Sequence, residues 1–316
     1  MEIPNLLGFV VILRESINLL PRNGKLMACI TSIYLLFYSL FFLAFSFASK
    51  SLFRDMLIKE SIIPISTPNS SDFTNALEGI RKDALLSFLL NFAFIASFVI
   101  LSFFSTIATI FTSAFSYSDQ TLSPTDMLSR IKKSWISLFI TWFYTTLLVI
   151  GYFFFGLSMS FPLMMSSNIY TSIDRVIWFA IFAYIFYLYI SVDWVLGLVV
   201  SVIEENLCGL EALGKAGKMV KGKKLHGFSM NITFGLMSLV IFQGLRLIKG
   251  EKWLFNETAY MLVMVMFSVL FNVFQLVAYT VLYFHCKKNN GEEVELQAAS
   301  VEYGKLPSLP LINATN

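Results

Sequence analysis

The stretch 192–224, VDWVLGLVVSVIEENLCGLEALGKAGKMVKGKK, decides the fold. An apolar run with one acid, Asp193, leads to Glu204 and Glu205. A short glycine-containing amphipathic segment follows, and then a cluster of lysines. In so apolar a chain, this order is typical of a membrane helix that leaves the bilayer, a segment in the interface and lysines at the lipid headgroups.

The composition of the whole chain agrees with that interpretation. Of its 316 residues, 57% are hydrophobic and only 14% are charged, whereas an average soluble protein has about 25% charged residues. The net charge of +3 is too small to indicate a nucleic-acid partner. The length would allow two soluble domains, but the apolar runs favour one helical membrane domain.

Six apolar runs are long enough to cross a bilayer, which takes roughly 20 residues. Lipid leaves few alternatives to helices for such runs, because backbone groups need hydrogen bonds. We therefore expect an all-α polytopic membrane protein with an interfacial helix (1–25), a six-span domain (26–286) and a disordered tail (287–316). The predicted spans are 26–48, 84–115, 134–161, 176–203, 227–245 and 258–284.

An even number of spans places both termini on the same side of the membrane. Most of the 23 Lys and Arg residues fall on that side, so the positive-inside rule makes it cytosolic. Arg81 and Lys82, beside the second span, count against this orientation. We expect an integral protein of the endoplasmic reticulum, another endomembrane or the plasma membrane.

Three segments outside the spans have a helical repeat of apolar residues and are expected to lie on the cytosolic face. In 4–20 and 123–135 the apolar faces include Val10 with Ile17 and Leu128 with Ile131. In 207–220 glycines border the apolar face, where they would allow another backbone to approach closely. That third face consists of Leu210, Leu213, Gly217 and Val220.

Asp193 is the one acid well inside a predicted span. An ionisable residue in a membrane indicates either a transport site or a polar contact that locks helices together. One acid among six spans is sparse for a proton relay, so we favour the structural contact. The candidate partners, by chemistry alone, are Asn91, Gln243, Asn272 and Gln275.

The densest group of cations begins within the third amphipathic segment and continues directly after it. Each cation near an anionic leaflet contributes about 1 kcal/mol to binding. The group therefore predicts contact with anionic lipid or phosphate, or it acts only as a topology determinant. It consists of Lys215, Lys218, Lys221, Lys223 and Lys224.

Two kinds of modification site are candidates. Asn69 begins an acceptor sequon in a predicted lumenal or extracellular loop. Cys29, Cys208 and Cys286 lie near the predicted cytosolic face, where cysteines can be palmitoylated and where disulfides are not expected. Inert reduced thiols are the simpler interpretation.

The sequence offers little from which to assemble an enzyme. It has two histidines, His226 and His285, and no nucleophile elbow, phosphate loop or metal-ligand spacing. We expect a non-enzymatic protein without a metal or cofactor.

The pattern EENLCGLEALGKAGKMVKGKK at 204–224 resembles the membrane-domain family named after glycerophosphoryl diester phosphodiesterases. SWISLFIT at 134–141 resembles the helix-into-span element of that family. From ILRESINLLPRNGK at 12–25 onward, the chain resembles a plant-specific group of uncharacterised six-span proteins. The soluble phosphodiesterase domain has no counterpart here, so the resemblance implies a helical membrane module and no catalytic activity.

These observations favour a protein that engages lipid headgroups or partner proteins at its cytosolic face, in membrane organisation or trafficking. The expected partners are the bilayer, anionic lipids and unidentified proteins. The alternative is a small-solute or lipid transporter with Asp193 in its pathway. An accessory subunit of an enzyme is a third class.

Overall fold

The computed structural model describes residues 8–22, 24–63, 70–118, 124–165, 169–204, 206–250 and 257–291. These residues form eight α-helices, and none of them lies in a strand. Six helices are long and apolar enough to cross a membrane, which confirms the all-α, six-span class. The helices are α1 (Gly8–Leu19), α2 (Gly24–Ile62), α3 (Ser71–Tyr117), α4 (Pro124–Met164), α5 (Ile169–Ile203), α6 (Gly209–Met219), α7 (Lys224–Gly250) and α8 (Glu257–Asn289).

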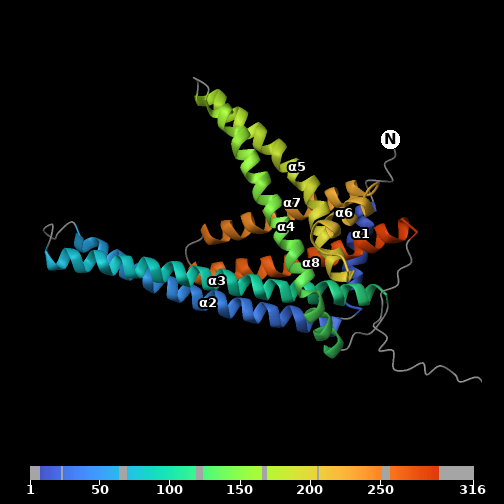
Figure 1. Cartoon of the computed structure of the whole chain (residues 1–316), viewed down its shortest axis with the longest axis horizontal. Helices are drawn as coiled ribbons and strands as arrows, with labels where there is room; N and C mark the ends of the chain where they lie inside the picture. The colour runs from blue at the N-terminus through green and yellow to red at the C-terminus, as the bar shows by residue number, and fades with distance from the viewer. Residues whose placement is uncertain are drawn as a thin grey trace, which may run out of the picture.

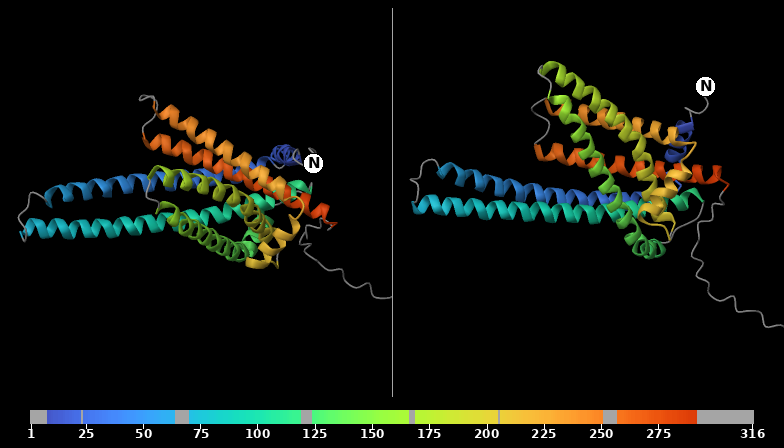
Figure 2. Two further views of the ribbon diagram at one scale, coloured as in Figure 1. Left: turned by 90° about the horizontal axis from the view of Figure 1, so that it is seen from above. Right: turned by 45° about the horizontal axis from the view of Figure 1, so that its top comes forward.

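The six long helices form three hairpins, α2–α3, α4–α5 and α7–α8, which diverge from a common end (Figures 1 and 2). The short helices α1 and α6 lie at that end, and so do the first described residue and the last turn of α8. We call this region, made of α1, α6 and the adjoining parts of the other helices, the closed end. Both ends of the described chain therefore lie on one side of the bundle, as six crossings require.

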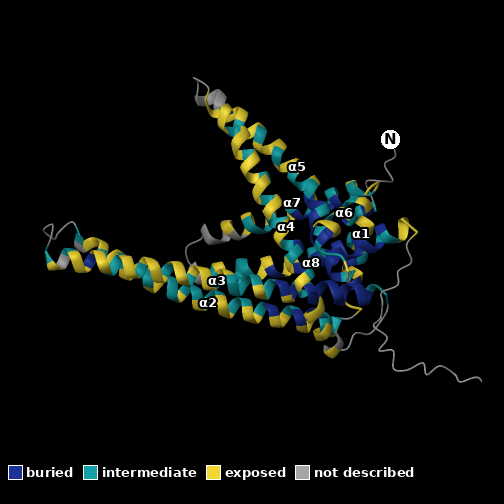
Figure 3. Ribbon diagram, viewed as in Figure 1, coloured by how far each residue is buried: buried dark blue, intermediate teal, exposed yellow. Residues whose placement is uncertain are grey.

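Burial is concentrated at the closed end (Figure 3). The largest fully buried side chains include Ile107, Leu196, Tyr279 and Phe284. Away from this end, the hairpins expose large apolar side chains such as Phe153, at 63%. In a chain that crosses a membrane, these exposed faces meet lipid tails, which are as apolar as the side chains themselves.

The helices α2 and α3 are longer than a bilayer is thick. They contain 39 and 47 residues, or about 58 and 70 Å at 1.5 Å per residue, against a hydrocarbon thickness of about 30 Å. The side chain of Ser70 caps α3 by accepting a hydrogen bond from the amide of Phe73 (3.2 Å). Near the α2–α3 turn, Lys59 Nζ lies 2.5 Å from Asp83 Oδ2 and joins the two helices.

Helix α6 packs closely against α5 and α4, and two glycines make this possible. A Cβ on Gly197 of α5 would lie 2.6 Å from Leu213 Cδ2 and 3.3 Å from Leu213 Cα. Gly209 has a φ of +60°, and its amide donates a hydrogen bond to Thr141 Oγ1 of α4 (2.9 Å). These contacts seat the start of α6 between two membrane helices.

The predicted apolar face of this segment was right for Val220, which is buried, and for Leu213, which packs on Gly197. It was wrong for Leu210, which is 60% exposed, and the buried residues within α6 are Gly209, Ala212, Ala216 and Met219. Gly214 and Gly217 have no neighbouring element within 4 Å of an added Cβ, so they are not the close-approach glycines. Three of these four buried residues are glycine or alanine, which let the backbones come near.

The predicted apolar face of the N-terminal helix was wrong for Val10 and Ile17. Helix α1 buries Ile12, Ser16 and Leu19 against α8, α7 and α3. Val10 and Ile17 are exposed. Residues 1–7 lie outside the described part of the chain.

The amphipathic segment at 123–135 is helical from Pro124 onward, but it is continuous with the third span in α4. Ile131 is buried, whereas Leu128 is 66% exposed. The boundary predicted between this segment and the span is therefore absent.

We expect the α2–α3 turn and the closed end to lie on opposite sides of the membrane. In a chain with Cys29, Cys208 and Cys286 replaced by Ala, single cysteines at Thr74 and at Lys218 should react differently with an impermeant maleimide. Only one of the two should be labelled in sealed vesicles, and both after permeabilisation. Labelling of both positions in sealed vesicles would contradict six crossings.

We also expect Gly197→Val to push α6 away from α5, because the new side chain meets backbone atoms. Overpacking of this kind costs about 1–3 kcal/mol, so the purified protein should unfold at a temperature several degrees lower. In a chain with Cys29 and Cys208 replaced by Ala, reaction of the buried Cys286 with a thiol dye reports the unfolding. Gly151→Val is the matched control, because that site faces open space; equal melting of both variants would refute the close-packing role.

Candidate functional site

The closed end brings together most of the charged residues that the sequence indicated. Asp193 of α5 and Glu204, the residue after α5, form ion pairs with lysines of other segments, and Glu15 of α1 contacts the ring of His285. Each pair is partly buried, and loss of one partner would leave a charge in a poorly hydrated place. The pairs thus decide which cations remain available at the surface.

Asp193 pairs with Lys224, the first residue of α7. Asp193 Oδ2 lies 2.5 Å from Lys224 Nζ, and the two side chains are 23% and 24% exposed. The ammonium group also lies 4.5 Å from the centre of the Tyr189 ring, which adds a cation–π contact to the ion pair. Asp193 Oδ1 is buried and accepts no hydrogen bond from the described residues.

The expected partners of Asp193 were therefore wrong: the described contact is with Lys224 and not with Asn91, Gln243, Asn272 or Gln275. Helix α7 starts beside the middle of the apolar run of α5, because Gly227 lets Val192 pack at the position a Cβ would occupy. Asp193 thus lies level with the beginning of a neighbouring helix. The acid and the lysines were one cluster, which the sequence analysis treated as two.

Glu204 connects three helices at the end of α5. Its Oε2 lies 2.7 Å from Lys215 Nζ of α6, and its Oε1 accepts a hydrogen bond from the hydroxyl of Tyr283 of α8 (2.9 Å). The carboxylate is 18% exposed. Because charge-assisted hydrogen bonds are the stronger ones, this contact fixes α6 against both membrane helices.

Helix α1 is attached through Glu15. Its Oε2 lies 2.5 Å from His285 Nε2 of α8, and Lys223 Nζ donates a hydrogen bond to the carbonyl of His285 (3.4 Å). The ring of His226 occupies the position of a Cβ on Gly8. The two histidines therefore hold α1 in contact with α8 and α7.

The five lysines of the predicted cluster divide into two sets. Lys215, Lys223 and Lys224 are partly buried and bind to acids or to a carbonyl. Lys218 and Lys221 are exposed, and neither forms an ion pair with a described residue. Only these two project from the cluster as cations for an external anion.

A buried polar group that the sequence analysis missed lies beneath these pairs. Asn231 of α7 donates hydrogen bonds to the carbonyl of Leu188 and to the hydroxyl of Ser191, both at 2.9 Å. Tyr279 of α8 donates to Asn231 Oδ1 at 2.5 Å. The amide thereby joins α5, α7 and α8, and an asparagine within a predicted span was the signal that could have found it.

The three cysteines are free thiols that differ in exposure. Cys29 is exposed, Cys208 is intermediate and Cys286 is buried. Acylation remains a prediction, with Cys29 the most accessible of the three. Asn69, the predicted glycosylation site, lies outside the described residues, next to the Ser70 cap of α3.

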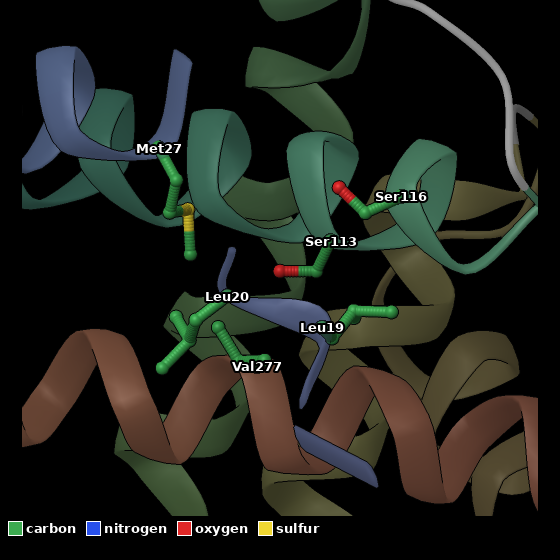
Figure 4. A pocket seen from close by; sticks show the side chains of 6 residues that line it. All are labelled: Leu19, Leu20, Met27, Ser113, Ser116 and Val277. Carbon is green, nitrogen blue, oxygen red and sulfur yellow. The ribbon is translucent and has the colours of Figure 1, made fainter. Parts of the chain in front are cut away.

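A small cavity lies between α1, α2, α3 and α8 (Figure 4). Its volume of about 10 Å³ is enough for at most one water molecule. Six residues line it, and the hydroxyl of Ser113 points into it: Leu19, Leu20, Met27, Ser113, Ser116 and Val277. A cavity of this size has no room for an organic ligand.

We expect the energies of Asp193 and Lys224 to be coupled. Asp193→Asn should leave membrane insertion intact, because the amide is neutral. Asp193→Asn and Lys224→Met should each lower the free energy of unfolding. The double variant should lose less stability than the sum of the two single losses. SDS-titrated unfolding should give a coupling of about 0.5–3 kcal/mol.

The exposed pair Glu78 and Lys82 (64% and 74% exposed) is the matched control, and Glu78→Gln with Lys82→Met should show no measurable coupling. Additive effects of the Asp193 and Lys224 substitutions would contradict the structural role of that pair.

The comparison with known families matches residues 2–303 to a family described as a domain of unknown function, DUF8558. The matched region includes all eight helices and the whole closed end. No curated protein and no solved structure matches the chain. Since the match spans nearly the whole sequence, the chain belongs to the DUF8558 family.

Proposed function

We propose that this protein is a non-enzymatic membrane protein whose closed end binds anionic lipid headgroups, in membrane organisation or trafficking. The observation that carries the proposal is the outward face of α6. It exposes Leu210, at 60%, together with Lys218, and Lys221 is exposed in the turn that follows. An exposed leucine beside lysines on a short amphipathic helix is typical of a segment in the membrane interface.

Helix α1 supports the same function. Its exposed face carries Val10, Val11 and Ile17 around the exposed Arg14. Both short helices lie crosswise to α2, α3 and α8 (Figure 1), an orientation suited to helices that lie in the plane of the interface. In this proposal the aliphatic side chains enter the headgroup layer while the cations contact phosphates.

The ion pairs define which lysines are proposed to contact lipid. Lys215, Lys223 and Lys224 are held by groups of the protein itself. Lys218 and Lys221 are left for the bilayer, and at about 1 kcal/mol each they would contribute about 2 kcal/mol. We propose that the closed end faces the cytosol, where anionic lipids are concentrated.

A transporter with Asp193 in its pathway is the second candidate. The unpartnered Oδ1 of Asp193 is the one observation in its favour. Transport through this site would require the carboxylate to leave Lys224, which holds Oδ2. We rank this function second, together with a role in binding partner proteins. Kinship with the plant-specific group, and with the glycerophosphoryl diester phosphodiesterase membrane domain, remains a prediction.

We expect Lys218→Gln with Lys221→Gln to weaken the binding of phosphatidylserine by roughly 30-fold, because about 2 kcal/mol is lost. Native mass spectrometry of the full chain, titrated with phosphatidylserine or phosphatidylcholine, measures the effect. The phosphatidylcholine occupancy should not change.

Lys82→Gln is the control, because Lys82 is 74% exposed but lies near the α2–α3 turn. A parallel titration with inorganic phosphate distinguishes a site for lipid from a site for free phosphate. Equal phosphatidylserine binding by the double variant and by the control would reject the proposal and leave the lysines as topology determinants.

A further inference from the structure

We propose that the acidic segment 292–295, which follows α8, docks on Lys218 and Lys221 and competes with anionic lipid for them. The docking itself depends only on this chain, and the competition rests on the proposed function. The segment reads EEVE and contributes Glu292, Glu293 and Glu295. Its carboxylates would form intramolecular ion pairs with the two exposed lysines.

The position at which α8 ends carries this inference. The side-chain amide of Asn290 donates a hydrogen bond to the carbonyl of Met219 (3.4 Å), the last residue of α6. Met219 lies between Lys218 and Lys221 in the sequence. The chain therefore leaves α8 beside the turn that carries the two lysines, although α6 and the end of α8 are about seventy positions apart in the sequence.

The reach of the segment is sufficient. Gly291 is the last described residue, and its φ is +72°. A glycine in this left-handed region commonly follows a helix and turns the chain away from the helix axis. Four extended residues span at most about 14 Å, which is more than two turns of an α-helix. The carboxylates at 292–295 can therefore meet Lys218 and Lys221 without any rearrangement of α6.

The charges at the closed end favour this occupant. The acids Glu15, Asp193 and Glu204 are already engaged by His285, Lys224 and Lys215. Three glutamates then enter the chain within four residues of the described end. An exposed ion pair is weak by itself, but a tethered partner acts at an effective concentration in the millimolar range. The tethered acidic segment can thus compete with a lipid headgroup for the ammonium groups of Lys218 and Lys221.

Zero-length carbodiimide cross-linking of the full chain in phosphatidylcholine nanodiscs tests the docking directly. The expected product is an isopeptide between Lys218 or Lys221 and a glutamate of 292–295, identified by mass spectrometry. The pair Lys215 and Glu204 (2.7 Å) is the internal positive control. Formation of the control product without any product from 292–295 would overturn the proposal.

A mixture of ¹⁵N-labelled and unlabelled protein, with each nanodisc holding two copies, separates docking within one chain from exchange between copies. Products within one chain support the proposal, and products that join a labelled to an unlabelled chain would overturn it.

Lipid binding tests the competition. Glu292→Gln with Glu293→Gln and Glu295→Gln should raise the affinity for phosphatidylserine several-fold, and the gain should vanish in the Lys218→Gln, Lys221→Gln background. Cross-links without lipid binding in any variant would refute the proposed function and leave the docking intact. Lipid binding at the two lysines, with no cross-link to 292–295 and no rise in phosphatidylserine affinity in the glutamine variant, would refute the docking alone.

Discussion

The closed end depends on the cost of removing the carboxylates of Asp193 and Glu204 from water. Asp193 lies on α5 and Glu204 directly follows it, where this helix packs against α6, α7 and α8. An ionised carboxylate in such surroundings is stable only when a cation or several donors face it. Lys224 and Lys215 meet this requirement from two further helices. The positions of α6 and α7 are thereby tied to the acids on α5.

The same constraint explains why the molecule is closed at one end and open at the other. Lipid removes the hydrophobic driving force between membrane helices, so small residues and polar contacts must hold them together. These contacts are concentrated at the closed end, where Gly197 and Gly209 admit α6 and Asn231 joins three helices. Toward the far ends the hairpins expose phenylalanine and leucine, and they diverge (Figure 1).

The helical class and the number and order of the six spans could be predicted from the sequence, because an apolar run of twenty or more residues has few alternatives to a helix in lipid. The orientation of the short helices could not. Leucine is equally suited to a protein core and to lipid, so Leu210 gave no indication that it lies outside and Ala212 inside. Apolar periodicity identifies an amphipathic helix here, but not the side that faces the bundle.

The pairing of the charges was also beyond the sequence, for a different reason. Asp193 and Lys224 are 31 positions apart, and their contact follows from the level at which α7 begins beside α5. That level is set by the steric fit of Gly227 with Val192, which no local pattern reveals. The lysine cluster appeared uniform in sequence, yet the structure turns Lys215, Lys223 and Lys224 inward and leaves Lys218 and Lys221 outward.

The unbroken α2–α3 hairpin has a mechanical consequence. Its helices run without interruption from the closed end to a turn about 60 Å away. Such a rod is a lever: a rotation of one degree at its base displaces its tip by about 1 Å, as the product of angle and arm length requires. A load on the distal turn is therefore transmitted to the buried contacts of α3, among them the stacking of Tyr117 on Phe284.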